Sequence, residues 1–326
     1  MTIVPATAAA AVPAKISASA AAALVATILA GVLAVADLRA QRGPALPPAL
    51  IKEGVTQKIA DHVYVIPDFD VVLVPNVTIV VGTRGTLVVD TGMGARNGQA
   101  VMREVDKVST GQELYLAVTH VHPEHDLGAG GFPARTKMLR SKDQEAEIQE
   151  SGLATAKIFA GFSPLNAELL QGAEFRKADI SFEREQVVDL GGVRARVMAM
   201  GPNHTKGDVA VFVEPDRVLV SGDLAMMGLP QFSSPASRLA TWLTTLDRFD
   251  ALKPVRIVPS HGAMGDASLI ATYRTFLTTV RDRAAAVKKD GKSVDDTVRL
   301  VQDELQARFN RNQMASAIRA AYNEAQ

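Results

Sequence analysis

The chain has 326 residues, no cysteine and a formal net charge of zero. Its length fits one large domain, or one domain with an extension. The neutral balance of charge gives no reason to expect a nucleic acid as partner, and the lack of cysteine excludes disulfides and thiolate metal ligands.

Residues 1–50 are interpreted as a targeting segment and a proline-rich linker that stand apart from the fold. Residues 16–36 carry no charge, and about 20 apolar residues are what a membrane span requires. The run Ala34-Val35-Ala36 resembles the cleavage site of an export signal. We expect a periplasmic protein cut after Ala36 or, as second choice, Ala40. There are two alternatives: an uncleaved membrane anchor and a disordered leader. The anchor would be the one expected contact with a membrane. Mass spectrometry that finds Met1 intact in cytosolic protein would contradict export.

Apolar runs bounded by turn residues predict three strands, over 63–66, 77–81 and 86–89. The segment Gly82–Gly85 is the predicted turn between the last two. His62 precedes the first strand and is interpreted as an ordinary strand or edge residue. Four apolar side chains follow that strand, and they predict either a flap over a site or part of the core: Phe69, Val71, Val72 and Leu73.

A dense cluster of histidines follows a predicted helix over 95–108 and a predicted buried strand over 115–118. Three of the six histidines in the chain lie at positions 120, 122 and 125. His120 and His122 are two residues apart, so they point the same way at a strand end but cannot share a helix face. Pro123 stops any strand, and glycines follow. Imidazoles and a carboxylate at this density indicate a zinc-like metal in a loop, rather than solvated histidines.

Three more polar residues follow strands in the second half of the chain. After a mixed, largely helical region over 140–175, strands are predicted over 187–190, 193–200, 209–213 and 218–220, with hairpin turns at 191–192 and 215–216. His204 lies in a turn-rich segment between two of these strands. Asp223 ends the run Ser221-Gly222-Asp223, and His261 follows a short strand at 257–258.

The C-terminal part of the chain is predicted to be helical. Apolar residues recur at helical spacing over 239–249 and again over 269–287. Ser293 is a predicted cap for a further helix over 294–305. We expect one domain over 51–290, followed by a helical extension over 291–326.

Together these motifs resemble those of the metallo-β-lactamase-fold metallohydrolases, over roughly residues 56–290. The family's hallmark is H-x-H-x-D-H followed by a later histidine, an aspartate after S-G and a terminal S-H-G histidine. The resemblance implies an α/β fold, an αββα sandwich of two mixed sheets with helices outside. One position departs from the family pattern, because Glu124 stands where the motif has aspartate.

The resemblance also implies roles for individual residues. His120, His122 and His204 would bind a first divalent ion, and Glu124, His125 and His261 a second, with Asp223 bridging the two. Zinc is the expected metal, with iron or manganese as alternatives. Glu124 is the candidate general base. Asp90, which ends the strand at 86–89, would orient a ligand histidine, unless it only forms a turn.

The implied activity is hydrolysis of an ester, thioester, lactone or amide bond in a small molecule by a metal-bound hydroxide. An acidic residue at Asp223 resembles the general hydrolase and glyoxalase-II-like branch. Lactamases usually have cysteine or serine there, so lactamase activity is a minority alternative. Because one fold can host several functions, two further classes stay open: an oxidoreductase with one iron, similar to persulfide dioxygenases, and a metal-binding protein without catalysis.

Overall fold

The structure, a computed structural model, describes residues 48–109 and 113–325. The expected export segment and both predicted cleavage positions lie outside the described residues. Within the described ranges, no helix is long and apolar enough to cross a membrane.

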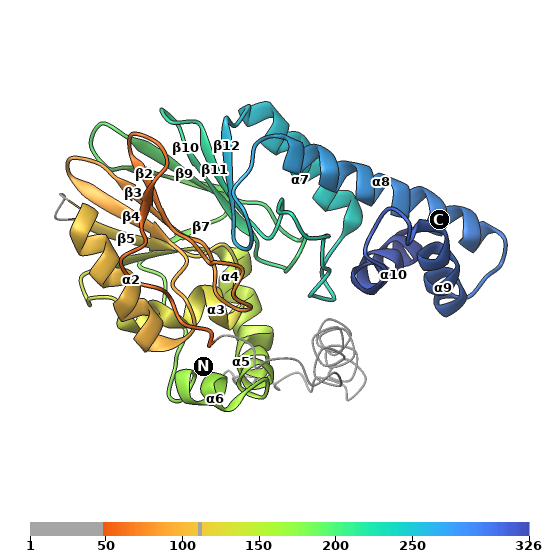
Figure 1. Ribbon diagram of the computed structural model, residues 1–326, viewed down its shortest axis with the longest axis horizontal. Coiled ribbons are helices and arrows are strands. Elements are labelled where there is room, and N and C mark those ends of the chain that lie inside the picture. Colours follow the sequence, from red (N-terminus) through yellow and green to blue (C-terminus); the bar gives the residue numbers. More distant parts are fainter. Residues whose placement is uncertain (1–47, 110–112, 326) are drawn as a thin grey trace, which may run out of the picture.

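Two β-sheets lie face to face and carry helices on their outer sides, which gives four layers (Figure 1). The first sheet has the spatial order β1 (Gln57–Lys58), β2 (Val63–Ile66), β3 (Val77–Val81), β4 (Gly85–Val89), β5 (Glu113–Ala117), β6 (Lys137–Ser141), β7 (Ile180–Phe182). The second has the order β12 (Arg256–Pro259), β11 (Val218–Gly222), β10 (Val209–Val213), β9 (Arg194–Ala199), β8 (Glu185–Asp189). Both sheets contain parallel and antiparallel pairs. The predicted αββα sandwich of mixed sheets is therefore confirmed.

The apolar runs of the central strands fill two cores at once. In β4, Leu87 packs in the core between the sheets, whereas Val88 packs under the helix on the outer side. In β10, Val211 lies in the same central core and Phe212 packs against the helices outside the second sheet. Because successive side chains of a strand point to opposite faces, an uninterrupted apolar run is buried on both faces of its sheet.

The directions of the strands place four loops at one edge of the sandwich. Strands β4 and β5 are parallel, and so are β11 and β12, while β9 and β11 both run antiparallel to β10. The loops that follow β5, β9, β11 and β12 meet there. Val209 N donates to Thr119 O at 2.7 Å across the two sheets, and Ser260 N donates to Gly222 O at 3.1 Å.

Three predicted strands, 63–66, 77–81 and 209–213, coincide with β2, β3 and β10. The short β1 and β7, and also β6, lie outside the predicted strands. Strand β6 has the sequence Lys-Met-Leu-Arg-Ser, whose arginine interrupts the apolar pattern. Arg140 is nevertheless buried, because it forms an ion pair with Asp126. A hydropathy pattern does not show such a pair, and for this reason the prediction makes the region from residue 140 helical.

The helices that connect strands of the first sheet lie in the two regions predicted to be helical, 95–108 and 140–175. Helix α2 (Gly94–Val108) matches the predicted helix over 95–108, and it covers the outer face of the first sheet. The region predicted as mixed and helical contains α4 (Lys142–Glu147), a π-helical turn (Ile148–Gly152), α5 (Leu153–Ala160) and α6 (Pro164–Leu169). Helix α6 begins at its proline because Ser163 Oγ accepts from Asn166 N at 3.0 Å and caps it.

Four helices form the C-terminal part: α7 (Leu239–Leu252), α8 (Ser268–Lys289), α9 (Val294–Leu305) and α10 (Ala315–Glu324). Helices α7 and α8 lie along the second sheet, and α9 and α10 pack against α8 farther from the strands (Figure 1). The predicted cap of α9 is present, since Ser293 Oγ accepts from Asp296 N at 3.2 Å. Val301 of α9 and Ile318 of α10 lie in the same core as Leu219 of the sheet. The predicted extension thus shares a core with the sandwich.

Helix α10 also holds the start of α7 through one carboxylate. Helix α7 has no side-chain cap of its own. The Glu324 side chain accepts from Leu239 N at 2.6 Å and from Ala240 N at 3.0 Å. The first amides of a helix have no partner within the helix, and they attract negative charge. Glu324 therefore acts as the missing cap from the other end of the C-terminal region.

Replacing Glu324 by alanine should lower the free energy of unfolding by about 0.5–2 kcal/mol, the range for loss of a helix cap. Urea denaturation of the full chain measures this change. The matched control is Glu304→Ala, which removes another carboxylate of the C-terminal helices whose ion pair with Arg283 is solvent-exposed. Surface pairs contribute little. Equal stability of the two variants would show that the contact of Glu324 with α7 does not stabilise the fold.

Candidate metal centre

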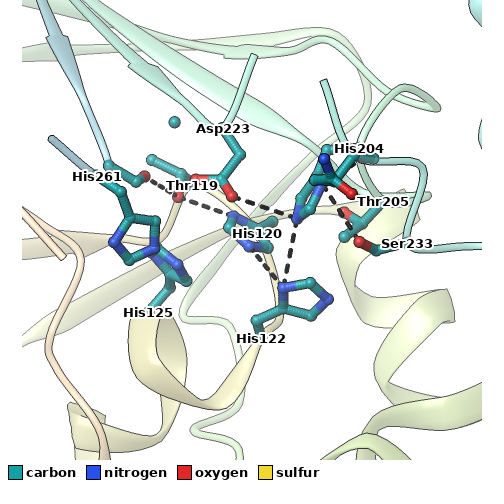
Figure 2. Close-up of polar contacts among 12 residues, drawn as sticks. Thr119, His120, His122, His125, His204, Thr205, Asp223, Ser233 and His261 are labelled. Atoms are coloured by element: carbon teal, nitrogen blue, oxygen red, sulfur yellow. Dashed lines mark hydrogen bonds and ion pairs between the residues drawn. The ribbon is translucent and has the colours of Figure 1, made fainter. Parts of the chain in front are cut away.

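Seven side chains converge at the edge of the sandwich where the loops after β5, β9, β11 and β12 meet, and Figure 2 labels all of them except Glu124. They are the residues for which the sequence predicts metal-binding roles: His120, His122, Glu124, His125, His204, Asp223 and His261. Their possible ligand atoms form three overlapping groups, and within each group all of these atoms lie within 4.8 Å of one another.

The first group joins His120, His122 and His204. His120 Nε2 lies 3.0 Å from His122 Nδ1, and His122 Nδ1 lies 3.4 Å from His204 Nε2. A tetrahedral zinc ion with Zn–N bonds of about 2.0–2.1 Å holds its ligand nitrogens about 3.3 Å apart. Both separations from His122 Nδ1 are therefore close to what one ion of that size requires. His120 and His204 present Nε2 to the shared space, whereas His122 presents Nδ1.

Backbone carbonyls orient two of the histidines through their other ring nitrogen. His204 Nδ1 lies 2.7 Å from Gln231 O, and His261 Nδ1 lies 3.0 Å from Val74 O. A carbonyl oxygen can only accept, so each Nδ1 carries the proton and Nε2 keeps its lone pair. Metal-binding histidines are commonly fixed in this way. Carbonyl acceptors have no signature of residue type, and the sequence therefore contains no signal for Gln231 or Val74.

Asp90 holds His125 and the loop after β5 together. Its carboxylate accepts from Thr119 N at 2.7 Å and Thr119 Oγ1 at 3.0 Å, and it lies 2.9 Å from His125 Nδ1. Ser260 Oγ lies 3.3 Å away, beside His261. The backbone φ of Asp90 is 69°, a conformation that costs free energy in a residue other than glycine. The hydrogen bonds of the buried carboxylate hold it there.

The remaining two groups lie next to the first. Glu124, His125 and His261 form one of them, and His120, His125 and Asp223 form the second. Glu124 Oε1 is 3.7 Å from His125 Nε2, and Asp223 Oδ2 is 3.4 Å from His204 Nε2. In Figure 2, His125 and His261 lie on the left of His120, His204 lies on its right and Asp223 lies above. Asp223 thus stands between the two sides of the cluster.

Three buried ligand atoms lack a hydrogen-bond partner among the described residues: Glu124 Oε2, His125 Nε2 and Asp223 Oδ1. Buried polar atoms are almost always paired, so each of these needs an explanation. All three belong to residues of the overlapping groups, and each is a donor type that zinc accepts. The residues present therefore fit the divalent ions that the sequence predicts.

The surroundings of His125 favour a positive charge. Burial by itself would lower the pKa of His125, but the charge and hydrogen bond of Asp90 outweigh burial and raise the pKa to about 9. A metal ligand must give up this proton. A divalent ion bound by His125 would supply positive charge in its place.

Four further groups of the cluster have shifted pKa values for identifiable reasons. Burial, reinforced by the neighbouring histidines, lowers the pKa of His120 and His122 well below the usual value and keeps both rings neutral. Burial raises the pKa of Glu124 to about 7. Burial also opposes ionisation of Asp223, but the surrounding histidines lower its pKa, so that it remains an anion.

Glu124 and His125 lie on a short helix, whereas the sequence predicts a loop. Helix α3 (Pro123–Asp126) begins at the proline. Proline suits the first position of a helix, because its fixed φ is helical and no N–H is needed there. The segment that follows packs closely on α2: a Cβ on Gly98 would lie 1.9 Å from Gly128 O. Only glycine at position 98 allows this approach, which sets the position of α3.

A buried ion pair fixes the last residue of α3. Arg140 Nη1 and Nη2 donate to the two Asp126 carboxylate oxygens at 2.6 and 2.7 Å, and both side chains are almost completely buried. Arg140 Nε also donates to Arg176 O at 2.8 Å. Asp126 directly follows His125, so the pair anchors the ligand-bearing helix to β6. The sequence holds only a weak signal for this pair, an arginine directly after Met138 and Leu139.

The apolar segment between β2 and β3 is partly exposed. Phe69 and Val72 are 47% and 44% exposed, so the interpretation of these two as core is wrong. Val71 and Leu73 are half-buried and pack against hydrophobic clusters. The base of the segment is tied to the His261 loop by Asn76, whose Nδ2 donates to Pro259 O and Gly262 O at 3.0 and 2.9 Å.

The loop over 223–238, between β11 and α7, contacts His204 and is itself held by the C-terminal helices. Ser233 N and Ser237 Oγ both donate to His204 O at 2.9 Å. In the same loop, Gln231 Nε2 donates to Gln313 O at 3.2 Å and Phe232 N donates to Ser316 Oγ at 3.3 Å. The position of His204 therefore depends on contacts with α10 and the turn before it.

His62 lies apart from this cluster. Its Nδ1 is 2.9 Å from Asp216 Oδ2, in the turn between β10 and β11, and its side chain is 32% exposed. Of the six histidines, it is the one outside the three groups, as its interpretation as an ordinary residue requires.

Comparisons with known proteins identify the family. The family model of the metallo-beta-lactamase superfamily matches residues 70–261, which contain all seven candidate ligands. The human acyl-coenzyme A thioesterase MBLAC2 is 24% identical over 204 residues, which are 57% of this chain and 72% of the human protein. The same protein from Bos taurus is 23% identical over the same shares.

Solved structures show the same fold. The sec-alkylsulfatase Pisa1 from Pseudomonas sp. has a TM-score of 0.65 at 14% identity and covers 82% of this chain, which spans 49% of the length of that protein. A beta-lactamase domain protein from Burkholderia ambifaria has a TM-score of 0.58 at 20% identity, with 83% of this chain and 88% of that chain covered. At these identities the likeness concerns the fold.

Proposed function

The chain belongs to the metallo-beta-lactamase superfamily of hydrolases, and from this premise we propose that it hydrolyses an acyl thioester or a related ester, lactone or amide at a dinuclear zinc site. The first ion would be held by His120, His122 and His204, and the second by Glu124, His125 and His261. Asp223 would bridge them.

One observation carries this proposal. The seven side chains form three overlapping groups, and the group with Asp223 shares a histidine with each of the other two. Three ligand atoms in these groups are buried without a partner among the described residues. A single tetrahedral ion uses at most four protein ligands. Seven converging donors therefore favour two adjacent ions.

Bound divalent ions supply a hydroxide near neutral pH and polarise the carbonyl of a substrate. The chain's own residues supply the rest. Glu124 has one carboxylate oxygen without a partner beside His125 and His261, where it can take the proton of an attacking water. The anionic Asp223 offsets positive charge at the centre. Asp90 fixes His125, and the carbonyl of Gln231 fixes His204, so that little reorganisation is needed during the reaction.

The choice of a thioester rests on the curated relative. The human protein that matches over 72% of its own length is named an acyl-coenzyme A thioesterase. An acidic bridging residue, here Asp223, also separates this chain from lactamases that have cysteine or serine at that position. Esters, lactones and amides react by the same attack on a carbonyl carbon, and they belong in the same test.

We expect two zinc ions per chain in the purified protein, because seven donors suffice for two sites. Elemental analysis after zinc reconstitution measures the ratio, and a panel of thioesters, esters, lactones, lactams and phosphodiesters measures activity. His261→Ala should lose one ion. His62→Ala is the matched control, since His62 lies outside the cluster, and it should keep both.

Three results would contradict the proposal. At most one metal after reconstitution excludes the dinuclear site. A single iron with consumption of oxygen supports an oxidoreductase instead. Two zinc ions without turnover on any substrate of the panel support a metal-binding protein without catalysis.

A further inference from the structure

A small apolar cluster lies directly beside one of the candidate metal ligands. The Phe159 ring on α5 packs against the His122 ring at a centroid distance of 5.4 Å. Phe162 packs on Phe159 at 4.9 Å. His122 is half-buried, whereas His120 and His204 are 1% and 4% exposed. The side of the first group at His122 is therefore the one that approaches the surface, and there it has an apolar neighbour.

The cluster continues from the helices to the segment between β2 and β3. Its buried members are Met93, Phe159 and Leu169, and half-buried apolar side chains pack around them, including Ile158, Phe162, Leu165 and Leu73. Leu73 belongs to the same segment as the exposed Phe69 and Val72. The carbonyl of Val74, one residue on, holds His261 at the other side of the centre. The apolar cluster thus extends from His122 to the segment whose Val74 carbonyl contacts His261.

We propose that the apolar surface formed by Phe159, Phe162, Leu165 and Leu73 binds the acyl chain of the substrate. The proposal rests on the proposed hydrolysis of an acyl thioester or ester. In that reaction the oxygen of water bonds to the acyl carbon, the carbon–sulfur bond breaks, and a carboxylic acid and a thiol leave. The acyl chain is attached to the carbon that reacts, so it must lie directly beside the metal centre.

The chemistry of the surface favours the acyl chain over the leaving group. The four side chains of this surface are aromatic or aliphatic, whereas the thiol of a coenzyme A ester carries phosphates, which call for cations. Half-buried aromatic and leucine side chains gain free energy when a chain of methylenes covers them. The contact between Phe159 and His122 puts the start of this surface next to the place of reaction.

The test is a series of acyl thioesters of one small thiol, from acetyl to decanoyl, hydrolysed by the zinc-loaded full chain. The chain has no cysteine, so a thiol reagent reports the product without background from the protein. We expect kcat/KM to rise with chain length by up to about fourfold per methylene that is buried. Alkyl sulfates of the same lengths, run in parallel, show whether the surface selects for the chain alone or for the acyl group.

Variants locate the effect. The double variant Phe162→Ala, Leu165→Ala should flatten the dependence on chain length, and Phe162→Leu should retain most of it, because an apolar side chain remains. The matched control is Leu153→Ala: Leu153 is on the same helix as Phe159 but is 70% exposed and outside the cluster. In this variant, kcat/KM should depend on acyl length as it does in the unaltered protein.

Binding of the product gives a result that does not depend on turnover. Calorimetry with decanoate and acetate should show tighter binding of decanoate, and the double variant should remove the difference. A flat dependence on chain length, or equal binding of the two acids by the unaltered chain, would overturn the acyl site. If no thioester is hydrolysed but decanoate is still preferred, the proposed reaction fails and the apolar site stands.

Discussion

Replacing Glu124 by glutamine should lower turnover by about 10²–10⁴, the usual loss when a general base is removed. Glutamine keeps the size of the side chain and removes its charge. The carboxylate is buried, with one oxygen unpartnered beside His125 and His261, and a glutamine amide cannot take up a proton there. The first ion should remain, because His120, His122 and His204 are unchanged. Steady-state kinetics on the best thioester and elemental analysis measure both results.

The change Glu124→Asp tests whether the longer side chain matters. Aspartate is the residue that the family motif has at this position. Here two contacts fix the C-terminal end of α3, the close approach of Gly98 to Gly128 and the Asp126–Arg140 pair. The helix cannot move to bring a shorter carboxylate forward, and small displacements in a catalytic site can cost about 10² in rate. We therefore expect Glu124→Asp to lose activity.

Two outcomes would contradict this role of Glu124. If Glu124→Asp retains or raises activity and binds the second metal ion more tightly, glutamate at this position is only a tolerated variant. Unchanged turnover in Glu124→Gln would remove the residue from the mechanism.

Replacing Arg140 by leucine should lower the free energy of unfolding by about 3–5 kcal/mol, because it leaves the buried Asp126 carboxylate without its partner. Arg140 and Asp126 have side-chain exposures of 1% and 0%. Urea denaturation measures the change. The control is Arg103→Leu, which breaks an exposed pair with Glu53 and should alter stability little.

The double variant Arg140→Leu, Asp126→Leu separates stability from positioning. Replacement of a whole buried pair by apolar residues is often neutral or stabilising, so the double variant should recover most of the lost stability. It also removes the ion pair that holds α3. We expect it to bind the second zinc ion more weakly than the unaltered chain, as measured by competition with a chelator. Full stability of Arg140→Leu alone would show that the pair is not needed.

Local patterns in the sequence predict several strands and helices and mark the positions of the candidate ligands, whereas the four layers are what the family resemblance implies. The strands β2, β3 and β10 are continuous apolar runs, and five of the histidines lie where such runs end. Strands that finish at one edge bring those residues together without any long-range information beyond the order of the strands. The family resemblance added the assignment of residues to the two ions.

The parts that the sequence did not predict depend on partners distant in the chain. Strand β6 contains a charged residue whose burial becomes favourable only when Asp126 lies opposite. The orientation of His204 depends on the carbonyl of Gln231, 27 residues away. The tie between Asn76 and the His261 loop joins residues more than 180 positions apart. No periodicity or motif encodes such contacts.

The loop over 223–238 connects α10 to His204, and this connection determines when the metal centre can form during synthesis of the chain. Among the described elements, α10 is the last to leave the ribosome. Before then, Phe232 N lacks the Ser316 hydroxyl and α7 lacks the Glu324 carboxylate. When α10 leaves the ribosome, His120 and His122 have already been outside it while about two hundred further residues were added. A nascent chain should therefore expose an incomplete pair of imidazoles, and stable loading of zinc should follow translation rather than accompany it.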